Sequence, residues 1–196
     1  MKLPIRALTT ALCAAWLGHC PAHAEQGVRI GPFVDLTAGA TTAAFGDIGQ
    51  ASGASSDQSA SGFKLGAGYW FSEHWGVHVH GIRSGTIERK YAAGTYRADI
   101  ESYGVSLLGR LPINERWAVI GKVTLDHVDA SERKPAAGVA GFEKLSGRST
   151  NLVLPGVEID YRLSDSLDLI FEAEGRGNAG KELAVGYLGL GLRFSF

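Results

Sequence analysis

The chain contains 196 residues, of which 27 are glycine, and its formal net charge is −1. Apolar residues make up 45% of the chain and charged residues 20%, so the chain is too apolar and too weakly charged for a disordered polymer. Glycine does not recur at every third position, which excludes a collagen-like rod. The charge balance gives no basic surface for nucleic acid, and the length fits a single domain.

Residues 1–24 are typical of a secretory signal peptide. A positively charged start, a short apolar stretch and a small-x-small triplet that ends at Ala24 follow one another in the required order. The apolar stretch is too short for a membrane-spanning helix. Cleavage after Ala24 leaves residues 25–196 as the expected mature domain. It also removes Cys13 and Cys20, so no disulfide is expected in that domain.

After the signal peptide, apolar residues recur at every second position in eight segments. A β-strand sends alternate side chains to opposite faces, so each segment predicts a strand with one apolar and one mixed face. Pro155 cannot donate to a strand ladder and predicts a bulge in the sixth strand. The predicted strands are residues 28–40, 62–71, 75–87, 98–111, 117–128, 150–163, 167–176 and 183–196.

The connections between these strands alternate in length. Residues 72–74, 112–116 and 164–166 predict tight turns. The polar segments 46–61, 88–97 and 129–149 predict long loops, and residues 177–182 form a shorter fourth loop. Alternating short and long connections are typical of successive hairpins in an up-and-down barrel that has short turns at one end.

The two faces of the strands indicate which side meets lipid. Aromatic residues on the apolar face gather next to the short turns, as in the girdle at one interface of a membrane barrel. In lipid, every backbone polar group needs an internal partner, and a closed barrel provides one. A lipocalin-like soluble barrel, with its apolar face inside, is the less favoured alternative. The girdle residues are Tyr69, Phe71, Trp75, Trp117, Tyr161, Phe194 and Phe196.

The opposite face carries charges that we expect to line the interior. Eight strands leave an interior just wide enough for side chains, and glycines on this face make room for long charged ones. The inward set is Arg29, Asp35, Lys64, His78, His80, Arg110, Lys122, Asp126, Glu158, Asp160, Arg162, Glu172, Glu174 and Arg193.

The end of the chain resembles the terminal assembly signal of bacterial outer-membrane barrels, in which Gly191, Phe194 and Phe196 match the pattern. The turn segments 69–75 and 161–167 are similar to those of the outer-membrane protein A transmembrane domain and its small-barrel relatives. This resemblance implies an eight-stranded antiparallel up-and-down transmembrane β-barrel in the bacterial outer membrane. It also implies contact with lipid and lipopolysaccharide, and insertion by the barrel-assembly machinery through Phe196.

Five inward charges lie at heights where we expect them to meet: Arg110, Lys122, Glu158, Glu172 and Arg193. They form either an ion-pair gate in a narrow pore or a polar plug that satisfies its own charges. We favour the plug, because eight strands leave so little lumen.

Catalytic, metal and cofactor sites are not predicted. His78 and His80 share one strand face, but a metal site needs a third ligand and the sequence identifies none. The mature domain contains neither a His-x-Ser pair, as in outer-membrane lipid A deacylases, nor a Gly-x-Ser-x-Gly elbow.

The sequence therefore predicts a monomeric, non-enzymatic barrel with a structural or surface-interaction role. Its long loops are expected to contact host molecules or other surface ligands, and no nucleic acid is expected as a partner. A narrow porin-like channel is the alternative, and a lipid A-modifying enzyme is less favoured.

Overall fold

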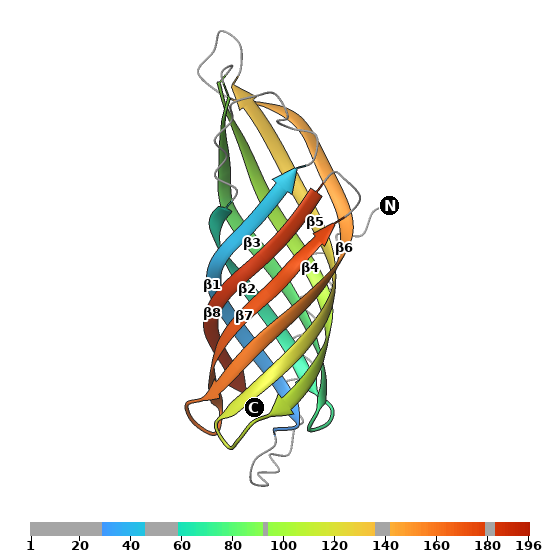
Figure 1. Ribbon diagram of the computed structural model, residues 1–196, viewed down its shortest axis with the longest axis vertical. Helices are drawn as coiled ribbons and strands as arrows, with labels where there is room; N and C mark the ends of the chain where they lie inside the picture. The colour runs from blue at the N-terminus through green and yellow to red at the C-terminus, as the bar shows by residue number, and fades with distance from the viewer. Residues whose placement is uncertain (1–28, 46–58, 92–93, 136–141, 179–182) are drawn as a thin grey trace, which may run out of the picture.

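The computed structural model describes residues 29–45, 59–91, 94–135, 142–178 and 183–196. They form one closed barrel in which each strand is antiparallel to the next and β8 pairs with β1 (Figure 1). The predicted fold class is confirmed. The predicted signal peptide lies outside the described residues, as does most of the loop predicted at residues 46–61. The strands are β1 (Gly31–Phe45), β2 (Ser59–Trp70), β3 (Trp75–Tyr91), β4 (Gly94–Pro112), β5 (Trp117–Pro135), β6 (Phe142–Arg162), β7 (Leu167–Asn178) and β8 (Leu183–Ser195).

The three tight turns are present, but the prediction of long loops at 88–97 and 129–149 is wrong over most of their length. β3 and β4 stay paired up to Tyr91 and Gly94, and β5 and β6 stay paired up to Pro135 and Phe142. The sequences of these segments lack the apolar–polar alternation that identifies a strand. Backbone pairing continues there without that signal.

The bulge predicted at Pro155 is also wrong. Pro155 pairs in register with Val123 of β5, so β6 passes this position without an extra residue. The effect of the proline falls on the other edge of the strand, where the pairing of β6 with β7 ends at Gly156 and Glu174. A proline has no N–H to donate, and here the ladder to β7 stops beside it.

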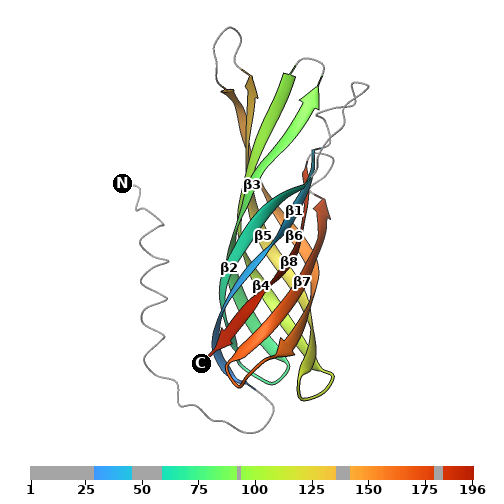
Figure 2. The ribbon, with the colours of Figure 1, turned by 90° about the vertical axis from the view of Figure 1, so that its left-hand side faces the viewer.

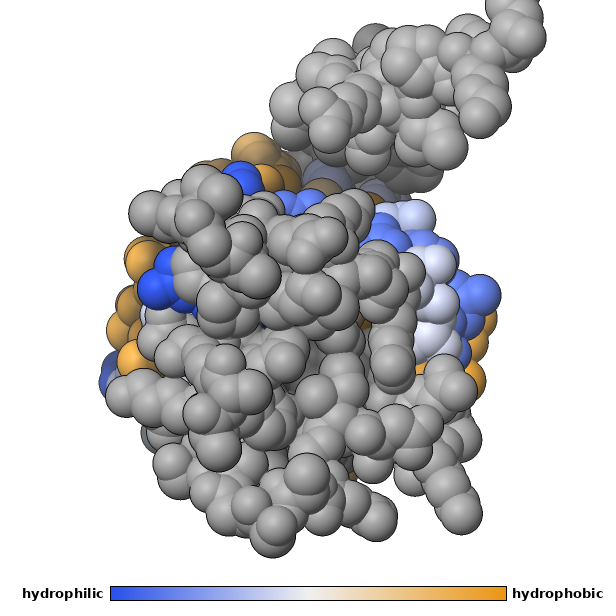
Figure 3. Space-filling model, turned by 90° about the horizontal axis from the view of Figure 1, so that it is seen from above, coloured by the Kyte–Doolittle hydropathy of each residue, from blue (hydrophilic) through white to orange (hydrophobic). Residues whose placement is uncertain are grey.

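The strands turn their apolar face outward. Leu190 and Val123 are 55% and 54% exposed, whereas Arg193 and Lys122 are 1% and 3% exposed. Viewed from the end that carries the long hairpins, apolar residues show at the circumference of the barrel (Figure 3). The soluble alternative, with apolar side chains inside, is therefore wrong. Among the described residues, no helix is long and apolar enough to cross a membrane.

Glycines bring the backbones of β1 and β8 close together where the barrel closes. Gly39 lies opposite Gly189, and a Cβ atom added to Gly39 would overlap the carbonyl oxygen of Leu188. A Cβ atom on Gly191 would likewise overlap the carbonyl oxygen of Leu36. Backbone atoms cannot move aside as a flexible side chain can, so closure depends on the small size of these residues.

We expect Gly39→Ala to lower the free energy of unfolding by about 1–3 kcal/mol, the usual cost of overpacking. Urea unfolding in detergent micelles, followed by tryptophan fluorescence, measures the change. Gly121→Ala is the control, because its added Cβ atom would meet only the Gly109 carbonyl oxygen, at 3.9 Å. Equal losses in the two variants would contradict a packing requirement that is specific to the closing strands.

Candidate functional site

Arg193 organises the lower half of a buried charge network inside the barrel. Its guanidinium lies 3.0 Å from a carboxylate oxygen of Asp35, 2.7 Å from Glu158 and 3.0 Å from Asp160. Asp35 also contacts Nε2 of His78 at 3.1 Å. All of these side chains are almost completely buried, so the guanidinium replaces lost water contacts with three carboxylates on two strands, β1 and β6.

Two lysines organise the upper half of the network. The Lys122 ammonium lies 2.7 Å from Glu172, 3.0 Å from Glu174 and 3.6 Å from Glu158. The Lys64 ammonium lies 2.9 Å from Glu172 and also contacts Glu174. Glu158 contacts both Lys122 and Arg193, so it joins the two halves of the network.

Small residues on the inward face give these side chains their space. A Cβ atom added to Gly66 would lie 2.5 Å from a carboxylate oxygen of Asp35 and would overlap the His78 ring. One added to Gly104 would lie 2.6 Å from a carboxylate oxygen of Asp126. The alternation of glycine with charged residues along the strands is thus a packing requirement of a narrow lumen.

Four of the five charges predicted to meet are in one network: Lys122, Glu158, Glu172 and Arg193. Arg110 lies nearer the tight turns, with its guanidinium 3.9 Å from the centre of the Trp70 ring. The sequence did not select Asp35, Asp160, Lys64 and Glu174 as members of the network, although all four belong to the predicted inward set. Lys64 on β2 reaches Glu172 on β7 across the lumen. The alternation of residues along each strand does not give the relative heights of residues on strands that are not neighbours.

Apolar side chains close the lumen on both sides of the charge network. One cluster, near the tight turns, contains Phe33, Trp70, Leu108 and Ile120, and each is at most 1% exposed. The second cluster, toward the long hairpins, contains Ile100, Val128, Ala130, Leu152, Leu154 and Val185. An ion that crossed this lumen would have to pass both clusters and displace paired charges, which favours a plug over an open pore.

The described residues contain no group of three His, Cys, Asp or Glu side chains that is placed to hold a metal ion. The His78 and His80 rings are stacked with centroids 5.5 Å apart. Nε2 of His80 lies 3.6 Å from Asp126, and His78 faces Asp35, so both rings belong to the polar interior.

The strands β3 to β6 extend beyond the rest of the barrel as a four-stranded sheet up to the β4–β5 pair Arg97–Arg133, and beyond this pair as two separate hairpins (Figure 2). Below this extension, the Tyr103 and His127 rings lie next to each other with centroids 4.9 Å apart. The His127 ring also contacts the Asn151 side chain at 2.7 Å. Polar and aromatic residues at this height mark the upper membrane boundary, because aromatic girdles flank the apolar band of such barrels.

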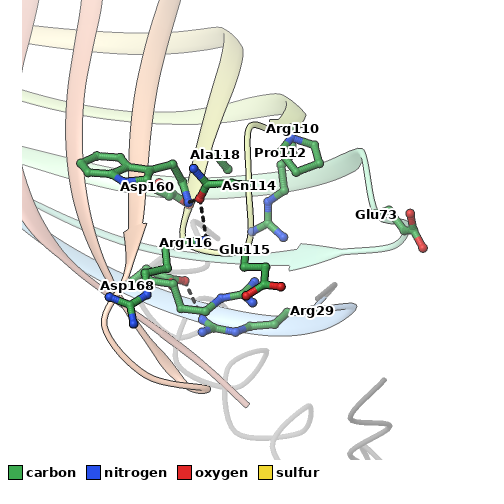
Figure 4. Close-up of a pocket in the computed structure, with 12 residues that line it drawn as sticks. Arg29, Glu73, Arg110, Pro112, Asn114, Glu115, Arg116, Ala118, Asp160 and Asp168 are labelled. Atoms are coloured by element: carbon green, nitrogen blue, oxygen red, sulfur yellow. Dashed lines mark hydrogen bonds and ion pairs between the residues drawn. The ribbon is translucent and has the colours of Figure 1, made fainter. Parts of the chain in front are cut away.

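The opposite mouth of the barrel carries a cluster of arginines. Arg29 bonds to Asp168 at 2.6 Å and also donates to the backbone carbonyl of Ser164. Figure 4 shows Arg29, Arg110 and Arg116 approaching one space from different segments, with Asp160 and Asp168 on its wall. This mouth is lined by charges of both signs, whereas the layer above it is apolar.

The residues of the predicted assembly signal lie at the end of β8. Phe194 and Phe196 face outward, and their rings meet edge to face with centroids 5.0 Å apart. The backbone N–H of Phe196 donates to the carbonyl of Pro32 at 3.1 Å, which ties the terminus to the start of β1. Gly191 lies inside the close β1–β8 contact described above.

An apolar outer band, aromatic residues at its two edges and paired charges inside define an integral outer-membrane β-barrel. Comparison with protein families identifies the group: residues 8–196 match the model of the outer membrane protein beta-barrel domain, and the chain belongs to this family. Members of this family are bacterial outer-membrane proteins, so this is the location of the protein. Comparison with curated proteins gives no match.

Solved structures share the fold at low sequence identity. Ail of Yersinia pestis is 18% identical, with a TM-score of 0.59, over 86% of this chain and 100% of Ail. Neisserial surface protein A is 22% identical, with a TM-score of 0.57, over 85% and 97%. OprG of Pseudomonas aeruginosa is 12% identical, with a TM-score of 0.61, over 87% and 98%.

We expect Glu172→Ala to lower the free energy of unfolding by about 3–5 kcal/mol, because it removes the carboxylate that Lys64 and Lys122 share in a buried site. The exposed pair Glu101–Arg83, at 3.4 Å, provides the control, and Glu101→Ala is expected to cost about 0–1 kcal/mol. Unfolding curves of the refolded barrels measure both. A Glu172→Ala curve that overlays the wild-type curve would show that the plug does not depend on this carboxylate.

Proposed function

We propose that this barrel acts at the cell surface through its four-stranded extension, and that its lumen is a structural plug. The observation that carries this proposal is the combination of a closed interior with paired strands that continue past the upper boundary. A channel needs an open lumen, whereas a contact surface needs rigid structure outside the membrane.

The extension is long enough to stand clear of lipid headgroups. On β5, the outward band from Trp117 to His127 has about the length that a tilted strand needs to cross the bilayer core. The strand continues to Pro135, which at about 3.3 Å per residue and a tilt near 45° adds roughly 20 Å of height. Pairing with β4 and β6 holds this segment in place. A hydrogen-bonded sheet loses less freedom on binding than a loop does.

Related folds support a surface role. Ail carries the name attachment invasion locus protein and was solved in complex with sucrose octasulfate, a heparin analogue. Neisserial surface protein A is also named for its place on the cell surface. By this analogy, the partner of the present barrel is a host or surface molecule that meets the extension. Lipid and lipopolysaccharide surround the barrel below it, because the protein lies in the outer membrane.

We assign no catalytic role to the barrel. This assignment rests on the mature sequence, which lacks the His-x-Ser and Gly-x-Ser-x-Gly patterns of the enzymes considered. We further propose that the barrel is a monomer and that the barrel-assembly machinery inserts it.

Shortening the two hairpins tests the surface role. An Asn-Gly turn replaces residues 88–97 in one hairpin and residues 132–146 in the other, because Asn-Gly suits a two-residue connection between antiparallel strands. We expect intact cells that produce the shortened barrel to lose binding to immobilised heparin. Heat-modifiable gel mobility should show that the barrel still folds. The shortened barrel is compared with wild type at equal surface amounts.

Binding that survives the shortening would contradict the surface role. Two measurements on the purified wild-type protein address the other functions. Steady single-channel currents in planar bilayers would favour the porin-like alternative, and modification of lipid A in vitro would favour an enzyme.

Removal of Phe196 tests the proposed assembly route. We expect its deletion to reduce the amount of heat-modifiable barrel in the outer membrane, because we propose that the assembly machinery recognises this terminal aromatic residue, and its backbone joins β1. Deletion of Phe196 is compared with Leu163→Ala, which alters an exposed apolar residue in a tight turn instead. Equal assembly of both variants would contradict a role for the terminus.

A further inference from the structure

A pocket of about 240 Å³ lies at the barrel rim between two neighbouring tight turns. It is lined by Arg116, Tyr161, Arg162, Leu163, Ser164 and Asp165. The two turns are held together by the backbone, because the N–H of Arg162 donates to the carbonyl of Arg116 at 2.8 Å. The pocket is therefore part of the rigid frame of the barrel.

The height of this pocket in the membrane is set by an aromatic pair. The rings of Trp117 and Tyr161 have centroids 4.6 Å apart on the outer surface, within the girdle next to the tight turns. Such girdles lie at the level of lipid headgroups. The Arg116 guanidinium donates to the Tyr161 hydroxyl at 3.3 Å, so its charge lies at this level too.

The pocket has charged and apolar surfaces side by side, which match the charged headgroup and the apolar acyl chains of a phospholipid. Leu163 is 51% exposed at its edge, and on the membrane side Ile159 and Val157 continue an outward apolar path along β6. Arg116 and Arg162 both line the pocket, and arginine is the preferred partner of a phosphate. Asp165 adds a carboxylate to the same lining, which disfavours a headgroup that carries negative charge alone.

From this arrangement, we propose that the rim pocket binds a phospholipid of the periplasmic leaflet whose headgroup carries both a phosphate and a primary ammonium. Arg116 and Arg162 bind the phosphate, and Asp165 accepts hydrogen bonds from the ammonium. The acyl chains follow the apolar faces of β5 and β6. A quaternary ammonium has no N–H to donate, so phosphatidylethanolamine binds in preference to phosphatidylcholine. This site is independent of the proposed surface role, because it lies at the other end of the barrel.

Native mass spectrometry of the refolded full-length barrel tests the proposal. The barrel in detergent is mixed with phosphatidylethanolamine, phosphatidylcholine or phosphatidylglycerol. We expect preferential retention of phosphatidylethanolamine, and a loss of about tenfold or more in the Arg116→Gln/Arg162→Gln variant, the scale expected when charge-assisted hydrogen bonds are removed. Asp165→Asn is expected to abolish the preference over phosphatidylglycerol.

Arg83→Gln provides the matched control, because Arg83 is an exposed arginine on the part of the outer surface that lies toward the long hairpins. Its retention of phosphatidylethanolamine should equal that of wild type, and heat-modifiable mobility should show that every variant is folded. Equal retention by the double arginine variant and wild type would overturn the proposal, as would equal retention of the three lipids by wild type. Binding of soluble glycerophosphoethanolamine as tightly as the lipid would overturn the membrane part of the assignment.

Discussion

The cost of burying charge in a narrow lumen governs the interior of this protein. A carboxylate or ammonium that leaves water loses several kcal/mol unless an opposite charge replaces the solvent. Arg193 and Lys122 each meet three carboxylates, and Glu158 contacts both of them. This requirement fixes which residues stand at which height, and it makes the interior a single connected unit that joins strands far apart in the sequence.

The outer surface obeys a complementary requirement. Lipid offers no hydrogen bonds, so the backbone must be satisfied within the wall and the outward side chains must be apolar. Closure of β8 on β1 meets the first condition, and residues such as Leu190 and Val123 meet the second. The outward faces of the strands contact lipid and the inward faces form the charge network. Other molecules can therefore be recognised at the two ends of the barrel. The extension of β3 to β6 lies at one end, and the arginine-rich rim lies at the other.

Sequence periodicity predicted the strand segments that have lipid on one face and the lumen on the other. All eight strands and the inward position of Glu172 follow from alternation, because a shift of one residue would expose every lumen charge to lipid. The ends of β5 and β6 toward the long hairpins could not be found in this way, since residues 129–135 and 142–149 show no apolar–polar alternation. The contact between Lys64 and Glu172 also lay beyond prediction, because it depends on the stagger of β2 against β7 across the lumen. The bulge predicted at Pro155 was wrong because the sequence shows that a backbone N–H donor is missing. It does not show which neighbouring strand would have accepted that hydrogen bond.

The end of the β6–β7 ladder at Gly156 and Glu174 makes the wall of the barrel mechanically uneven. β5 and β6 are joined from Trp117 to Pro135, and β1 and β8 from Phe33 to Phe45. Among the described residues, β6 and β7 are joined only from Arg162 to Gly156, the segment nearest the tight turns. Local opening of a protein starts where the fewest backbone bonds must break. If the barrel opens, we therefore expect it to open between β6 and β7, beginning at Pro155, where their ladder ends.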